Sequence, residues 1–104
     1  MKAYKVKINS NASTDIQEAT DWYNAQLPKL GTRFQKKVIQ QINMLKNNAD
    51  NYSIRYADVR CMLIKKFPFL IHFVIEEANN VVEIFAVIHT SRNPKIWEQK
   101  TKKG

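Results

Sequence analysis

The sequence predicts a small α+β domain in the order β-α-α-β-β-β, with a helical hairpin packed on an antiparallel sheet. Three features indicate this class: an N-terminal stretch that alternates lysine with apolar residues, two helix-periodic segments joined by a short connection, and three apolar runs in the second half of the chain. The 104 residues are 44% hydrophobic and 25% charged, which suits one hydrophobic core. We therefore expect a single domain over residues 1–104, with a frayed basic tail at about 100–104.

The first strand is predicted at residues 4–8, where three apolar side chains alternate with two lysines. Residues 9–13 are polar and predict a break after this strand. Thr14 with Gln17 fits a capping box, in which the two side chains satisfy free backbone amides at a helix start. The apolar residues that follow recur at spacings of three and four, which predicts a first helix over 14–26.

A second helix follows a short connection in which Pro28 interrupts the first helix and Gly31 marks the turn or the entry to the next one. Its apolar stripe is the clearest periodic feature of the chain. The stripe consists of Leu30, Phe34, Val38, Ile42 and Leu45. The run at 47–51 has strong turn character and ends the helix. Two helices with so short a connection form an antiparallel hairpin.

Three strands are predicted after these helices, at 59–66, 69–76 and 81–89. The pair Phe67-Pro68 separates the first two strands, and residues 77–80 form a hairpin turn between the last two. Short connections of this kind produce an antiparallel meander. The last two strands are apolar on both faces, so the sheet is either covered on both sides or keeps one face for a partner.

The net charge of +8 is distributed unevenly. Residues 11–27 hold three acidic side chains and no basic one, whereas residues 28–48 hold five basic side chains and no acidic one. This surface favours a polyanionic or acidic partner over the alternative of a protein that is merely basic. Cys61, the one cysteine, predicts neither an internal disulfide nor a metal site. With no apolar run of about 20 residues and no signal-peptide pattern, we expect a cytoplasmic protein without a membrane partner.

Four stretches carry a resemblance to a known family: Asp15–Tyr23, Leu30–Val38, Lys66–Phe73 with Arg60 ahead of it, and Ile84–Pro94. The third contains a Phe-Pro-aromatic corner, and the fourth reads apolar-apolar-His-x-x-Arg-x-Pro. In this order and spacing, over residues 3–98, the chain resembles the RelE/ParE superfamily of bacterial toxins, often labelled plasmid stabilisation proteins. The resemblance implies the toxin of a type II toxin-antitoxin system, silenced in a hetero-oligomer by an antitoxin whose otherwise disordered segment wraps over the sheet and helices. It implies no cofactor.

The superfamily divides by target. RelE-like members cleave mRNA in the ribosomal decoding site, whereas ParE-like members bind DNA gyrase. The Trp22-Tyr23 pair in the first helix and the Phe-Pro corner resemble the ParE-like branch, which is not credited with nuclease chemistry. The tail after Pro94 contains Trp97 and lysines but lacks the tyrosine typical of the nucleases. We therefore favour a non-catalytic toxin directed at a protein such as gyrase.

Two alternatives stay open. The first is a metal-independent, ribosome-dependent mRNA endoribonuclease, and the second is a basic binding module that keeps the fold without toxicity. A plain single-strand binder is disfavoured, because basic residues do not alternate with the phenylalanines as they do on base-stacking sheets.

Candidate functional residues follow from what RNA cleavage without a metal needs: a base, an acid and cations around the phosphate. His89 and Arg92 are the catalytic candidates if the chain is a nuclease. Arg60, Lys65 and Lys66 are candidates for contact with a target or a phosphate, and all five side chains could converge on one surface.

Each candidate also has a structural interpretation. His89 could cap its strand by bonding the backbone of residues 91–93, and Arg92 could hold the C-terminal turn. Arg60 either pairs with a carboxylate such as Asp58 or Glu83 or faces the functional groove. Lys65 and Lys66 could form a solvated strand end.

Two further residues have a structural interpretation alone. The sequence predicts a core or edge histidine at His72 and a small core residue at Cys61.

Overall fold

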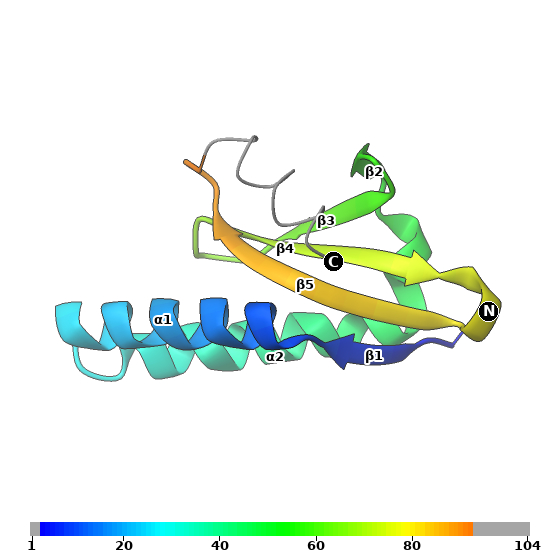
Figure 1. Ribbon diagram of the computed structural model, residues 1–104. Coiled ribbons are helices and arrows are strands. Elements are labelled where there is room, and N and C mark those ends of the chain that lie inside the picture. Colours follow the sequence, from blue (N-terminus) through cyan, green and yellow to red (C-terminus); the bar gives the residue numbers. More distant parts are fainter. Residues whose placement is uncertain (1–2, 93–104) are drawn as a thin grey trace.

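The computed structural model describes residues 3–92 (Figure 1). Two long helices and five strands make up the domain, together with two short 3₁₀ turns. The elements are β1 Lys5–Ile8, α1 Ser10–Gln26, α2 Leu30–Asn48, η1 Ala49–Asn51, β2 Ile54–Tyr56, β3 Val59–Leu63, β4 Phe69–Glu76, η2 Glu77–Asn79 and β5 Val81–His89. The expected α+β class is confirmed, and the bounds of β4 and β5 are those predicted.

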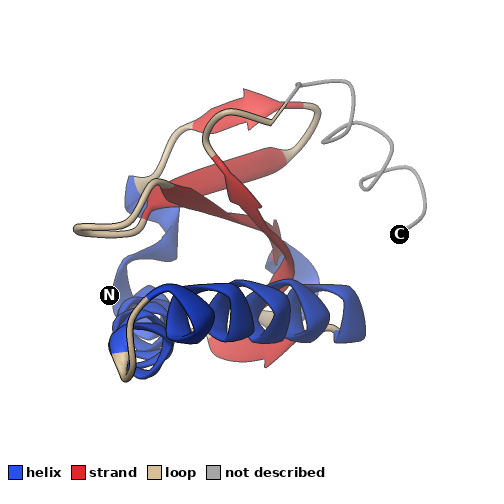
Figure 2. Ribbon diagram, turned by 90° about the vertical axis from the view of Figure 1, so that its left-hand side faces the viewer, coloured by secondary structure: helices blue, strands red, loops and turns tan. Residues whose placement is uncertain are grey.

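The five strands form one sheet in the order β1-β5-β4-β3-β2, and both helices lie on one side of it (Figure 2). Strands β2 to β5 are antiparallel as expected, but β1 pairs with β5 in parallel. The helical hairpin explains this difference, because it returns the chain to the start of β1, where the amide of Tyr4 donates to the carbonyl of Lys46 at 2.8 Å. The meander that starts there reverses direction at each strand, so its last strand runs alongside β1 in the same direction.

Helix α1 begins at Ser10, four residues before the predicted start. The Oδ1 atom of Asn9 accepts a hydrogen bond from the amide of Ala12 at 2.9 Å, so Asn9 is the N-cap. Ala12 is fully buried in the core, and this burial stabilises the first turn of the helix. The predicted break at 9–13 and the capping box of Thr14 were therefore wrong.

Two predictions about the middle of the chain also need correction. Strand β3 ends at Leu63 instead of residue 66, because Lys66 adopts a left-handed φ of 72° inside the turn to β4. Strand β2 was not predicted at all, since a strand of 3 residues is too short to show a period. The sequence also predicts a short helix at residues 95–99, and this segment and the tail at 100–104 lie outside the described residues.

The main core lies between the sheet and the helical hairpin. Phe34, Val38 and Leu45 of α2 are fully buried against Ile71 and Phe73 of β4. The stripe predicted from periodicity is thus the packing face of α2, and its burial stabilises the domain by roughly 1.5–3 kcal/mol for each large side chain.

A second apolar cluster lies on the other face of the sheet. A β-bulge in β5 opposite His72 shifts the register, so that Phe85 and Ala86 both join this cluster while Val87 returns to the main core. Residues 84–88 of β5 are all apolar and do not alternate with polar residues, because the strand is buried on both faces.

Gly31 sets how closely α1 and α2 approach. A Cβ at this position would lie 2.0 Å from the carbonyl oxygen of Thr20 and 2.7 Å from the side chain of Asn24. Asn24 in turn accepts hydrogen bonds from the amides of Gly31 at 2.7 Å and Thr32 at 3.3 Å, and so caps α2 from the neighbouring helix.

We expect Gly31→Ala to destabilise the domain by about 2–4 kcal/mol, because the added methyl group forces α2 away from the backbone of α1. Urea denaturation followed by circular dichroism measures this change. Thr32→Ala is the matched control, with an exposed side chain on the same turn, and should change stability by less than about 0.5 kcal/mol. Equal stability of the two variants would contradict the close helix contact.

Candidate functional site

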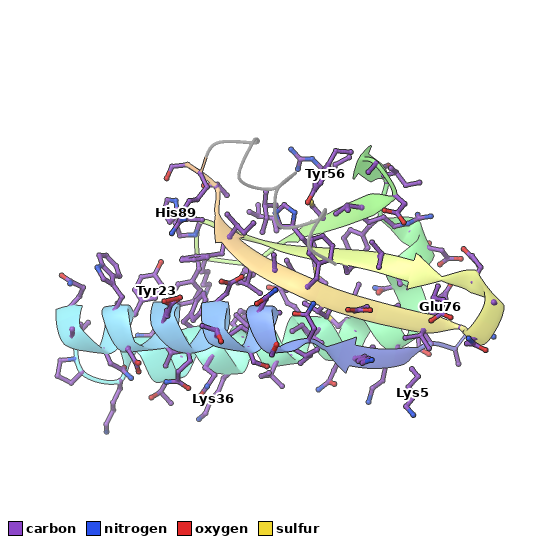
Figure 3. The ribbon with its side chains drawn as sticks, in the orientation of Figure 1. Lys5, Tyr23, Lys36, Tyr56, Glu76 and His89 are labelled. Carbon is purple, nitrogen blue, oxygen red and sulfur yellow. The ribbon has the colours of Figure 1, made fainter. Side chains whose placement is uncertain are left out.

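A cleft of about 510 Å³ lies between α1 and the end of the sheet where β4 begins and β5 ends. Its described lining combines aromatic, acidic and basic side chains. The lining residues are Asp15, Glu18, Ala19, Trp22, Tyr23, Pro68, Phe69, Val87, Ile88, His89 and Arg92. Figure 3 shows His89 at the end of β5, close to Tyr23 of α1. The cleft brings together two of the five predicted site residues, His89 and Arg92.

An aromatic cluster forms the floor and one wall of the cleft. The ring of Tyr23 lies 5.3 Å from that of Phe34 and 6.1 Å from that of Phe69 between centroids, and Trp22 packs edge-on against Tyr23. Burial raises the pKa of the Tyr23 phenol, which keeps the hydroxyl protonated. Trp22 is 59% exposed, so the cleft offers a large aromatic surface to a partner.

His89 is held by its own turn. Its ring packs edge-on against Phe69 at 5.2 Å, and Nδ1 accepts a hydrogen bond from the amide of Ser91 at 3.1 Å, with the Ser91 hydroxyl at 2.8 Å. A backbone amide can only donate, so in the neutral ring Nδ1 is the acceptor and Nε2 carries the proton. In this tautomer Nε2 can donate a hydrogen bond but has no free lone pair with which to act as a base.

Two carboxylates of α1 form the acidic wall of the cleft. Oδ2 of Asp15 accepts a hydrogen bond from the amide of Val87 at 2.9 Å and thereby fastens α1 to β5. Strand β1 pairs with β5 only as far as Ile84, so Asp15 replaces a strand partner beyond that point. Glu18 is exposed one turn later on the same wall. Asp15 and Glu18 line the same cleft as His89 and Arg92, so the charge of the cleft is mixed.

Arg60 does not join the cleft. Its guanidinium Nη1 donates to the carbonyl of Tyr52 at 2.6 Å and lies 3.4 Å from the carbonyl of Asp50. These bonds connect β3 to η1 and the start of β2. The Arg60 guanidinium therefore pairs with neither Asp58 nor Glu83, the carboxylates suggested as partners, and Arg60 does not line the cleft.

Lys65 and Lys66 lie in the turn between β3 and β4, and both are exposed. The turn adjoins the end of β5, since the amide of Thr90 donates to the carbonyl of Pro68 at 2.8 Å. The structure therefore brings the two lysines to the same end of the sheet as His89 and Arg92, while Lys65 itself lines a different hollow beside α2.

Gln41 is a residue that sequence reasoning missed. It is buried on α2, and its amide donates to the carbonyl of Leu63 at 2.9 Å while Oε1 accepts from the amide of Lys65 at 2.7 Å. A polar side chain beside the apolar stripe of α2 was the available signal. This clamp holds the turn that carries Lys65 and Lys66.

His72 is fully buried on the second face of the sheet, with Nδ1 3.0 Å from the hydroxyl of Tyr56 and 3.5 Å from Sγ of Cys61. Burial raises the pKa of the Cys61 thiol to about 11, although the positive charge of Arg55 opposes this shift. Both residues thus occupy core positions. Among the residues that the structure describes, no group of three or more His, Cys, Asp or Glu side chains is placed to hold a metal ion.

The sequence of residues 6–94 matches the family described as ParE toxin of type II toxin-antitoxin system, parDE. The chain belongs to this ParE toxin family. The predicted superfamily and the prediction of a type II toxin are thereby confirmed. No curated protein matches the sequence.

Solved toxin structures share the fold of this ParE-family chain. A chain of the chromosomal ParDE system from P. aeruginosa superposes with a TM-score of 0.76 at 16% identity, covering 86% of this chain and 98% of that one. A mutant of E. coli RelE in the free state gives a TM-score of 0.71 at 12% identity and covers 97% of both chains. The M. tuberculosis RelBE2 toxin-antitoxin complex gives 0.61 at 17% identity, covering 84% and 98%. The M. tuberculosis toxin was therefore solved together with an antitoxin.

The helices described between residues 3 and 92 include none that is long and apolar enough to cross a membrane.

We expect the Cys61 thiol of this toxin to react about a hundredfold more slowly with iodoacetamide at pH 8 in the native protein than in 8 M urea, since burial and a raised pKa both limit the thiolate. Mass spectrometry of timed samples gives the rate. The pKa of the Cys61 thiol in the folded protein lies above the ordinary 9.0, so the free energy of unfolding should fall as pH rises from 9.0 to about 11. Equal alkylation rates in the two states would show that Cys61 is accessible.

Proposed function

We propose that this toxin acts in the cytoplasm by binding a protein target such as DNA gyrase, without cleaving RNA, and that a cognate antitoxin holds it silent. The observation that carries this proposal is the hydrogen bond from the Ser91 amide to His89, which occupies Nδ1 and leaves Nε2 protonated. A general base needs a free lone pair close to the hydroxyl proton that it removes.

The charges of the cleft also favour a protein target. In RNA cleavage the phosphate carries negative charge in the transition state, and several cations placed around it stabilise this charge. Here Asp15 and Glu18 line the same cleft as Arg92, and Arg60 is engaged with backbone carbonyls elsewhere. Exposed tryptophan and arginine, in contrast, are the residue types that dominate binding energy in protein interfaces, and Trp22 and Arg92 line one cleft.

The antitoxin part of the proposal rests on the toxin family and on charge. A net charge of +8 attracts an acidic partner, and a disordered acidic segment that folds on binding can cover a large apolar surface. Antitoxins accompany the toxins in the RelBE structures that share this fold. The resting form would be a heteromeric complex.

Inducing the chain alone should arrest growth, and co-expressing the product of the adjacent reading frame should restore it. We expect messages to stay intact while DNA supercoiling falls, as measured by mapping RNA 5′ ends and by the topoisomer distribution of a reporter plasmid. New 5′ ends phased to codons within translated messages would overturn the proposal in favour of a ribosome-dependent nuclease. Absence of arrest at confirmed soluble expression would favour the non-toxic binding module.

His89→Ala separates the two toxin classes by magnitude. A general acid or base contributes about 10²–10⁴-fold to rate, so a nuclease would lose nearly all toxicity. For a protein-directed toxin, we expect inhibition of gyrase supercoiling by the purified variant to stay within about fivefold of the unmodified protein. His89→Gln is the control that preserves a hydrogen-bonding side chain.

Trp22→Ala should reduce inhibition of the target by about tenfold or more, because it removes an exposed aromatic side chain from the cleft. Leu27→Ala is the matched control, since Leu27 is comparably exposed but lies just beyond α1 and outside the cleft lining. The concentration that halves gyrase supercoiling measures both variants. Equal inhibition would exclude Trp22 from the target contact.

A further inference from the structure

The turn between β3 and β4, residues 64–68, contains a residue in an unfavourable backbone conformation. Lys66 has a left-handed φ of 72°, which is disfavoured for a residue with a side chain and persists only where the surrounding structure holds it. Glycine adopts this conformation without steric cost, but the turn contains no glycine. The Lys66 side chain is exposed, so its own packing in the core does not account for the conformation.

Gln41 holds this turn from the side of the helices. Its side chain is 4% exposed, its Nε2 donates to the carbonyl of Leu63 at 2.9 Å, and its Oε1 accepts from the amide of Lys65 at 2.7 Å. Strand β2 pairs only with the first two residues of β3, so β2 does not reach these two backbone groups. One buried side chain of α2 therefore fixes the backbone immediately before Lys66.

Two further contacts fasten the turn to the cleft beside α1. The ring of Phe67 packs edge-on against that of Tyr23, a lining residue of the cleft, at 5.2 Å between centroids. The carbonyl of Pro68 accepts from the amide of Thr90, and Pro68 itself lines the cleft. The turn is thus part of the rim of the cleft, and Lys66 lies two residues from its lining.

This end of the sheet presents cations. Neither the turn 64–68 nor the segment 89–92 contains an acidic residue, and Lys65, Lys66 and Arg92 are all exposed. Arg92 lines the cleft and Lys65 lines the hollow beside α2, whereas Lys66 lines neither. A protein docked in the cleft would therefore meet Lys66 as a cation at the rim, and a carboxylate is the group that this cation attracts.

From these features we infer that Lys66 binds a carboxylate on the surface of the protein target, and that Gln41 is the positioning residue that holds Lys66 in place. Gln41 contacts no partner itself and acts through the backbone of the turn. A charged group that is fixed before binding loses less entropy when it binds. This inference rests on the proposed function, because it names a contact with the protein target proposed above.

The test is a double-mutant cycle on the inhibition of purified DNA gyrase by the full-length chain. Gln41→Met preserves the length of the side chain but removes both hydrogen bonds to the turn, and it should weaken inhibition of supercoiling about tenfold. Lys66→Ala removes the cation and should also weaken inhibition about tenfold. Because Gln41 acts through Lys66, the double variant should again be weakened about tenfold, whereas independent effects would multiply to about a hundredfold.

Lys36→Ala is the matched control for charge. Lys36 is an exposed lysine on the same helix as Gln41, and it points away from the sheet (Figure 3). Lys36→Ala should change inhibition by less than about twofold. Urea denaturation should show the same loss of stability from Gln41→Met with and without Lys66→Ala, so a purely structural role of Gln41 does not produce the coupling in inhibition.

Hydrogen exchange at single amides measures the positioning directly. Gln41→Met should speed exchange at the amide of Lys65 about a hundredfold, because this amide loses its acceptor. The amide of Ile64 donates to the carbonyl of Phe69 at 2.9 Å and should change by less than about threefold. Gln41→Glu keeps an acceptor for the amide of Lys65, so it should restore both slow exchange and inhibition to within about threefold of the unmodified chain.

The outcomes separate the two proposals. If the unmodified chain inhibits gyrase but Lys66→Ala inhibits it equally well, Lys66 is not a contact and only this inference fails, a result that does not require Gln41→Met to fold. Losses that multiply in the double variant would show that Gln41 does not act through Lys66. If the unmodified chain does not inhibit gyrase, the proposed function fails and this inference fails with it.

Discussion

The requirement to bury both faces of β5 organises this domain. Val82, Ile84 and Val87 of this strand enter the core beneath the helices, whereas Phe85, Ala86 and Ile88 enter the cluster on the other face. A strand that is apolar on both sides must lie inside the sheet and needs cover on each face. The helical hairpin supplies one cover, and its return to the start of β1 places β1 beside β5 in parallel. The cleft beside α1 forms where β5 extends beyond the end of β1, so that α1 lies along that edge of β5 in place of a strand.

Side chains take over wherever regular backbone pairing stops. Asp15 accepts from the amide of Val87 beyond the end of β1, Gln41 binds the free edge of β3, and Asn24 caps α2 from α1. The first two of these bonds join elements that are distant in sequence, and all three satisfy backbone groups that would otherwise be costly to bury. These polar side chains therefore stabilise the edges of the sheet and the start of α2.

The same principle explains how far the sequence could predict the structure. Helix α2 was predictable from its repeating apolar stripe, and β4 and β5 from long apolar runs between turn residues, whereas β2 is too short to show either signal. The start of α1 was mispredicted because Asn9 offers a cap five residues before Thr14 does. In the candidate site, His89 and Arg92 lie three residues apart in the chain and line the same cleft. Spacing along the chain could not reveal that Arg60 serves the carbonyl of Tyr52, since long-range bonds from side chains to backbone leave no period in the sequence.

The two helices of the hairpin differ in charge, and the cleft beside α1 therefore differs in charge from the surface of α2. Helix α1 carries the acidic residues of the cleft, whereas α2 contains basic residues and no acidic one. An acidic partner of the kind proposed for the antitoxin would therefore be attracted to the surface of α2 and repelled by the carboxylates of α1.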